Sequence, residues 1–169
     1  MSNKRMKLYN IIFPIWIIWL IPTTWIIVLP LNFLIDLIVI VFAFKFIKNQ
    51  HIKSNAKKCI LYVWIFGFIS DFIGTVFMFL PNIIDLYTGE WWYNNLVAPL
   101  FLNPFSNFWS FVWSTISIVV SGIAIYFFNY KFSFRRTDMN KTEKKKVSLA
   151  LAVFTAPYLF YLPTEWFIK

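Results

Sequence analysis

Long apolar runs alternate with short polar stretches along almost the whole chain. A helix rises 1.5 Å per residue, so about 20 apolar residues cross the roughly 30 Å hydrocarbon layer of a bilayer. The pattern therefore predicts an all-α polytopic membrane protein, in which a single domain, residues 1–169, forms a bundle of five transmembrane helices. The predicted spans are residues 8–29, 31–47, 59–80, 109–128 and 147–162.

The dipeptide Leu-Pro closes three of these runs, at Leu29-Pro30, Leu80-Pro81 and Leu162-Pro163. Proline lacks the backbone N–H that continues a helix, and it disfavours helix in the residue before it. Each pair therefore predicts a helix end. Because the second run follows Pro30 at once, we expect the first two helices to form a tight hairpin there.

The segment between the third and fourth runs contains no Lys or Arg but several aromatic residues, which favour the headgroup level of a bilayer. Its apolar part, residues 96–108, is too short to cross and is interrupted by Pro99 and Pro104. Two interpretations stay open, an interfacial helix and a re-entrant loop. The interfacial helix is preferred, because a re-entrant backbone requires protein cover.

Asn140 and Glu143 precede the fifth run with the three-residue spacing of a capping box. This pattern predicts that a helix starts here, before the chain enters the membrane.

Composition and charge agree with a membrane protein. Apolar residues make up 60% of the chain and charged residues 14%, against about 45–50% and 25% in soluble domains. All but one of the 16 Lys and Arg residues fall into three clusters, within residues 4–7, 45–58 and 131–146. Cationic loops stay on the cytoplasmic side, so we expect a multi-pass plasma membrane protein with a cytoplasmic N-terminus and an external C-terminus.

The net charge of +9 lies at the ends of apolar runs, which favours anionic lipid headgroups over nucleic acid as the partner of the basic loops. A homo-oligomer or another membrane protein is a further expected partner, because five helices are few for a transporter. His51 is the single histidine, so zinc sites and nucleophiles activated by histidine lack a base. We expect no cofactor and no metal.

Two carboxylates lie inside apolar runs, where a charge costs about 2.5–3.5 kcal/mol on insertion scales. Asp71 falls near the middle of its predicted span, where no helix end can cap it, so it is the main candidate for binding an ion or a proton. Asp36 falls near the predicted start of its span. There the helix dipole and free N–H groups give a structural explanation, so Asp36 is the weaker candidate.

Small and hydroxyl residues surround these acids in the predicted bundle. Ser117 is expected at the depth of Asp71 and Ser114 one turn away, so both are candidate ligands for an ion or a proton. Gly67, Ser70 and Gly74 share the helical face of Asp71 and would let another helix approach closely. Four serines recur at helical spacing on one face of the fourth span: Ser110, Ser114, Ser117 and Ser121.

These residues support three hypotheses. The preferred one is permeation or secondary transport of a small cation or proton, with Asp71 as the binding group. The second is a non-catalytic accessory or assembly subunit that contacts another membrane protein through Asp71, Gly67 and Gly74. The third is an enzyme, because the two aspartates resemble the proton-sharing pair of the intramembrane aspartyl proteases. That family's Gly-x-Gly-Asp signature is replaced here by Ile69-Ser70 before Asp71, so we expect a non-enzymatic function.

Overall fold

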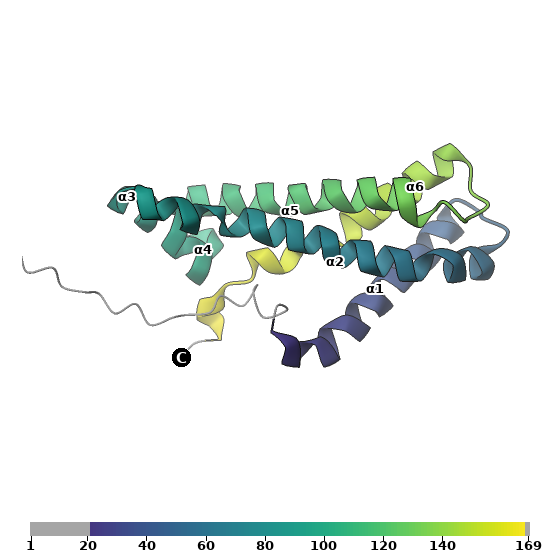
Figure 1. The fold of residues 1–169 in the computed structure, drawn as a ribbon, viewed down its shortest axis with the longest axis horizontal. Coiled ribbons are helices and arrows are strands. Elements are labelled where there is room, and N and C mark those ends of the chain that lie inside the picture. Colours follow the sequence, from purple (N-terminus) through teal and green to yellow (C-terminus); the bar gives the residue numbers. More distant parts are fainter. Residues whose placement is uncertain (1–20, 168–169) are drawn as a thin grey trace, which may run out of the picture.

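The computed structural model describes residues 21–167, and in that range it contains helices and no strand. The main elements are α1 (Trp25–Phe46), α2 (Ile52–Ile84), α5 (Phe108–Phe128) and α6 (Lys141–Phe154). Figure 1 shows α2 and α5 side by side along the long axis, with α1 crossing at an angle. The chain runs in opposite directions in α2 and α5, because Phe66 stacks on Phe128 and Phe77 on Trp113.

Three helical segments within residues 21–167 are long and apolar enough to cross a membrane, namely Pro22–Phe46, Ile52–Ile84 and Phe108–Ser133. Their outer faces carry large apolar side chains. Ile26 is 81% exposed and Phe46 83%. Apolar surface of this extent is unfavourable in water and fits a lipid environment. These segments include the predicted spans 59–80 and 109–128 and all but the last residue of the predicted span 31–47. Residues 8–20 of the first predicted span lie outside the described residues.

The chain does not turn at Pro30. Helix α1 begins at Trp25 and continues through Pro30, so the predicted helix end at Leu29 and the predicted hairpin are wrong. Residues 25–29, assigned to the first span, belong to the same helix as residues 31–46. Pro30 lies near the start of α1, where its missing N–H removes the backbone hydrogen bond to the Ile26 carbonyl and leaves the rest of the helix intact.

Helix α2 also continues past its Leu-Pro pair, so the predicted end at Leu80 is wrong. Pro81 removes the N–H that would bond the carbonyl of Phe77. The indole Nε1 of Trp113 on α5 donates to that carbonyl at 3.1 Å, and the Trp113 ring stacks on the Phe77 ring. A neighbouring helix therefore supplies the hydrogen bond that the proline removes, which lets α2 extend to Ile84.

The start of α6 confirms the predicted capping box. The side chain of Asn140 accepts from the backbone N–H of Glu143, and the Glu143 carboxylate accepts from the backbone N–H of Asn140. Both bonds satisfy N–H groups at the helix start that have no partner within the helix. Helix α6 consequently begins at Lys141, well before the apolar run.

The fifth predicted span, residues 147–162, is not one helix, because α6 ends at Phe154. Pro157 disfavours helix in the residue before it and leaves the Val153 carbonyl without its backbone donor. The hydroxyl of Tyr158 donates to that carbonyl and so stabilises the interruption. The chain then continues through two short 3₁₀ turns, η7 (Tyr158–Tyr161) and η8 (Thr164–Trp166).

The segment between α2 and α5 folds back against the bundle as a series of short helical turns. Leu96 and Leu100 are 4% and 1% exposed, and they belong to a cluster with Met78, Ile118 and Phe160. This cluster gives the apolar part of the segment protein cover. The turns are η3 (Asp85–Tyr87), α3 (Glu90–Trp92), the π-helical η4 (Tyr93–Val97), α4 (Ala98–Leu102) and η5 (Pro104–Ser106).

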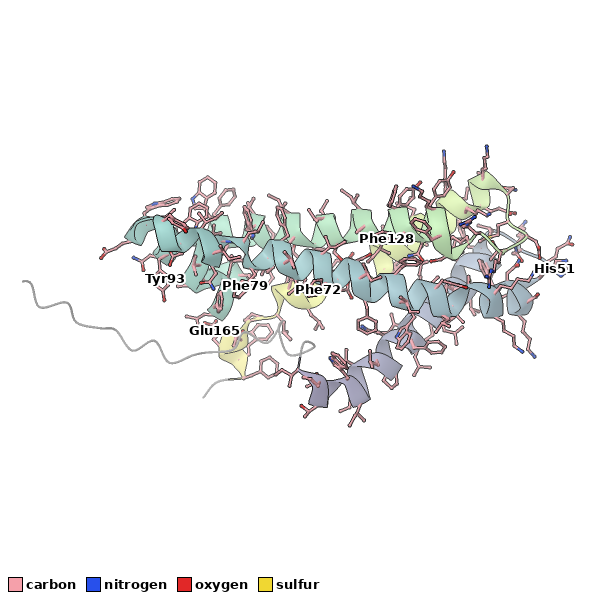
Figure 2. The ribbon with its side chains drawn as sticks, in the orientation of Figure 1. His51, Phe72, Phe79, Tyr93, Phe128 and Glu165 are labelled. Atoms are coloured by element: carbon pink, nitrogen blue, oxygen red, sulfur yellow. The ribbon has the colours of Figure 1, made fainter. Side chains whose placement is uncertain are left out.

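Both described basic clusters lie at the opposite end of the bundle, which His51 marks in Figure 2. The first turns of α2 and the loop after α5 meet there, since Lys58 Nζ forms a salt bridge with Asp138 Oδ2 at 3.1 Å. Asn55 strengthens the contact by accepting from the backbone N–H of Asp138. The first cluster, residues 4–7, lies outside the described residues. We call this the basic end.

A second apolar cluster lies between the basic end and the middle of the bundle. It joins residues of α1, α2, α5 and α6 with the loop that follows α5. The middle of α2 and α5 therefore lies between two apolar clusters. The fully buried members of the second cluster include Ile40, Phe44, Cys59, Val63, Ile125, Phe134, Val147 and Leu151.

Candidate functional site

Asp71 lies in the middle of α2 and contacts α5. The Ser121 hydroxyl donates to the Asp71 carboxylate, with 3.2 Å between Ser121 Oγ and Asp71 Oδ1. Both residues lie roughly 20 Å from the helix ends next to the folded-back segment, at 1.5 Å per residue. Phe72, labelled in Figure 2, marks this level at mid-length of the bundle. The predicted central position of the acid within its helix is therefore observed.

The serine that meets Asp71 is one turn further along α5 than the sequence analysis placed it. The expected depth of Asp71 was counted from a helix end at Leu80. Because α2 extends one turn further, its partner on the antiparallel α5 moves by one turn as well, from Ser117 to Ser121. This displacement is a direct consequence of the continuous helix at Pro81.

Ser114 and Ser117 are fully buried, but their hydroxyls donate within their own helix. Ser114 donates to the carbonyl of Ser110, and Ser117 to that of Trp113, each at 2.9 Å. Back-bonding of this kind satisfies a buried hydroxyl without a ligand. Among the four serines, whose side chains are all buried, the structure brings Ser121 to the carboxylate.

Helices α2 and α5 approach each other closely at Gly74. A Cβ atom added at Gly74 would lie 2.9 Å from the Ser121 Cβ, 3.1 Å from a ring carbon of Phe160 and 3.3 Å from the Ser117 carbonyl oxygen. The neighbouring Ser70 is fully buried and donates to the carbonyl of Phe66 at 2.7 Å. The small residues predicted to pack thus face elements of the same chain.

Asp36 lies in the middle of α1, because that helix begins at Trp25. The explanation of Asp36 by a nearby helix start is therefore wrong. Its side chain is 6% exposed, and no described residue donates a hydrogen bond to its carboxyl group. A Cβ atom added at Gly67 would lie 3.6 Å from Asp36 Oδ2. The carboxyl group of Asp36 thus lies against α2 beside Gly67, one turn from Asp71.

Asp36 and Asp71 line the same cavity, which has a volume of about 540 Å³. Helix α1 contributes Asn32 one turn before Asp36, and α2 contributes the rings of Trp64 and Phe68. The third wall is the chain from residue 154 to residue 163, where α6 is interrupted. Figure 1 shows this yellow segment running beside α2 toward α4. The two aspartates predicted as candidates therefore line one common cavity.

The interruption of α6 after Phe154 is consistent with the position of residues 154–163 beside the cavity. Non-helical backbone at membrane depth is stable only where it is buried in protein or lines a cavity. Phe160 anchors the segment in the apolar cluster beside Met78, and the hydroxyl of Tyr161 donates to Thr115 Oγ1 at 2.8 Å. These contacts hold the segment against α5 while its other side faces the carboxylates.

The charges around the cavity are unbalanced. Its described lining residues include two carboxylates and no Lys or Arg, and the Lys58–Asp138 ion pair lies at the basic end. An isolated carboxylate in apolar surroundings is costly unless a proton or a cation neutralises it. Within residues 21–167 no group of three or more His, Cys, Asp or Glu residues could hold a metal ion.

Sequence analysis missed two parts of this site. Asn32 was not among the candidate site residues, because it fell at the start of the predicted span 31–47, next to the predicted hairpin at Pro30. Residues 155–162 of the cavity wall were assigned to the regular span 147–162, although Pro157 within the apolar run was a signal that the helix is interrupted there. Both omissions have the same origin, an incorrect decision about which prolines end a helix.

Comparisons of the chain with protein-family models, with curated proteins and with solved structures found no match. The functional interpretation therefore follows from the geometry and charge of the site.

Proposed function

We propose that this chain is an integral membrane protein that moves a proton or a small cation through the cavity lined by Asp36 and Asp71. One observation carries the proposal: carboxylates from two different helices line one largely apolar cavity whose described residues include no basic side chain. Ionisable groups inside a membrane bundle generally mark ion or proton pathways.

Asp71 is the binding group, and the Ser121 hydroxyl orients its carboxylate through a hydrogen bond to Oδ1. Asp36 is the second binding group, one turn closer to the basic end, with its carboxyl group beside Gly67 of α2. The cavity volume of about 540 Å³ is large enough for several water molecules. Water between the carboxylates would relay a proton or partly hydrate a cation.

The proposed orientation places the basic end in the cytoplasm of a cell and the folded-back segment on the outside, following the distribution of Lys and Arg. In this arrangement α1, α2 and α5 each cross the plasma membrane. Helix α6 and the interrupted segment after it form one further crossing. Residues 90–106 enter the outer leaflet as a re-entrant turn, supported by the buried Leu96 and Leu100. The predicted cytoplasmic N-terminus lies outside the described residues.

The alternative of an accessory subunit gains less support. In that hypothesis Gly67, Asp71 and Gly74 contact another membrane protein. In the structure these residues face Asp36, Ser121 and the segment after α6 in the same chain. The proposed transport function accounts for the cavity, whereas the assembly function would leave it unexplained.

The test is flux into liposomes that contain the purified protein. A pH-sensitive dye inside the vesicles reports proton entry after a potassium diffusion potential is imposed. Cation entry is tested by comparing the flux in external sodium with the flux after a large organic cation replaces the sodium. We expect Asp71→Asn to lower the flux at least tenfold, because the amide cannot bind a proton or a cation as a carboxylate does. Asp36→Asn should lower it in the same direction.

Glu90→Gln is the matched control, because it neutralises an exposed acid on the folded-back segment, far from the cavity. Its flux should equal that of the unchanged protein. Equal flux in the Asp71→Asn and unchanged proteins would contradict the proposal, and so would flux no higher than in protein-free vesicles.

A further inference from the structure

A second and larger cavity lies between α1 and α6, near the basic end. Its volume is about 990 Å³, and its walls are apolar side chains together with two lysines, Lys45 and Lys146. Phe42 on α1 and Val153 on α6 border it and are 66% and 48% exposed. The cavity is therefore a groove that opens on the outer surface of the bundle, distinct from the space between Asp36 and Asp71.

The two lysines lie at the end of the groove near the loops. Lys45 is the penultimate residue of α1, and Lys146 directly precedes Val147, where the apolar part of α6 begins. Both positions correspond to the boundary between the hydrocarbon layer and the headgroups, where lysines bury their stems and extend their amines. Lys45 Nζ lies 5.9 Å from the ring centre of Phe42, so its stem follows the groove wall.

Neither lysine has a carboxylate partner among residues 21–167. At this end Asp138 is paired with Lys58, and the Glu143 carboxylate is used in the capping box of α6. The groove therefore combines a long apolar floor with two positive charges at one end. The complementary molecule is an amphiphile with apolar chains and an anionic head.

We propose that the groove binds one anionic phospholipid of the inner leaflet. Its acyl chain lies along Phe42, Ala150 and Val153, and its phosphate lies between the amines of Lys45 and Lys146. Basic pockets between helices on the cytoplasmic side suit lipids with anionic heads, because surface attraction and chain burial act together. The groove adjoins the cavity of Asp36 and Asp71, since Phe154 lines both.

The test is native mass spectrometry of the full chain in mixed micelles with equal amounts of phosphatidylglycerol and phosphatidylcholine. The unchanged protein should retain one phosphatidylglycerol molecule. The double variant Lys45→Gln and Lys146→Gln should retain it about 25-fold less tightly, at about fivefold for each lysine near a membrane surface. Ala150→Phe, which fills the groove and keeps both charges, should also release the lipid.

Lys53→Gln with Lys57→Gln is the matched control, because these exposed lysines of α2 lie at the same end of the bundle but do not line the groove. The affinity of this control variant for phosphatidylglycerol should stay within twofold of that of the unchanged protein. Thermal unfolding in the same micelles shows that each variant is folded.

Three outcomes would overturn the proposal: an equal loss in the control pair, retention of phosphatidylcholine as tight as that of phosphatidylglycerol, or a second copy of the chain in place of the lipid. The lipid site is separable from transport, because Asp71→Asn should keep the lipid whatever its flux.

Discussion

Two glycines on one face of α2 meet very different surroundings, although they are seven residues apart in the same helix. An added methyl group at Gly74 would press on Ser121 and Phe160, whereas at Gly67 it would make an ordinary contact with Asp36 Oδ2. The first glycine allows two elements to pack closely, whereas an alanine would fit beside the carboxyl group at the second. A glycine in a helix interior costs roughly 0.5–1 kcal/mol relative to alanine, and the close contact at Gly74 explains why that position has no side chain.

Gly74→Ala is expected to lower the free energy of unfolding by about 1–3 kcal/mol, because the new Cβ atom overpacks the contact between α2 and α5. Reversible unfolding in detergent micelles, followed by circular dichroism, measures the change. Gly67→Ala is the control and should leave the stability unchanged or raise it by up to about 1 kcal/mol, since alanine favours helix. Equal destabilisation by the two substitutions would show that the close approach at Gly74 has no energetic role.

At the scale of elements, two of the three Leu-Pro pairs lie inside helices, at Pro30 and Pro81. Aromatic side chains replace the backbone hydrogen bonds that are lost at Pro81 and at Pro157. Trp113 donates to the carbonyl that Pro81 leaves free in α2, and Tyr158 donates to the one that Pro157 leaves free at the end of α6. The results differ. In α2 the donor comes from another helix and the helix continues, while in α6 the donor is the residue after the proline and the helix ends.

Trp113→Phe is expected to lower the stability by about 1–3 kcal/mol, because it keeps an aromatic ring against Phe77 but leaves the Phe77 carbonyl without a donor. In a Pro81→Ala background the restored backbone N–H can bond that carbonyl. In this background Trp113→Phe should lower the free energy of unfolding by at least 1 kcal/mol less than it does with Pro81 present, on the order of one hydrogen bond. The double-mutant cycle uses unfolding free energies of all four proteins in the same micelles.

If Trp113→Phe costs the same in both backgrounds, the tryptophan stabilises α2 by packing alone. The indole hydrogen bond would then not explain how the helix passes Pro81.

At the scale of the whole molecule, the basic loops meet at one end and the short turns rich in aromatic residues at the other. Lys58 and Asp138 connect the start of α2 to the loop before α6, whereas Asn103 Nδ2 donates to Glu165 Oε1 at 2.6 Å at the opposite end. This polarity is the basis of the proposed orientation, because positively charged loops remain on the cytoplasmic side.

Single added cysteines test the orientation in intact cells with a maleimide that cannot cross membranes. Glu90→Cys should react from the outside, and Lys53→Cys should react after the membrane is permeabilised. The unchanged protein is the control, because its Cys59 is fully buried and should stay unlabelled in both conditions. The reverse pattern would show that the molecule lies in the membrane with the basic end outward.

Local patterns predicted a large part of the elements. Helix α5 begins and ends within one residue of the predicted span 109–128, and the capping box at Asn140 marks the start of α6. Hydropathy and capping depend on neighbouring residues, so they can be read without knowledge of the fold. Asp71 was found for the same reason, since a carboxylate in an apolar run is visible in the sequence itself.

The partners of these residues could not be predicted in the same way. The assignment of Ser117 rather than Ser121 to the level of Asp71 failed because a single proline was taken as a helix end. The role of Asp36 changed for the same reason, since its position within α1 depends on whether Pro30 ends a helix.

The amino-acid sequence alone thus determined that the chain is helical and apolar enough for a membrane, where its charges gather, and which carboxylates lie among apolar residues. Only the tertiary structure decided which prolines interrupt a helix, because the replacing donors, such as Trp113, come from side chains that folding brings near. It also decided that Asp36 and Asp71 share one cavity. A cavity depends on the packing of three elements, and no local pattern contains that information.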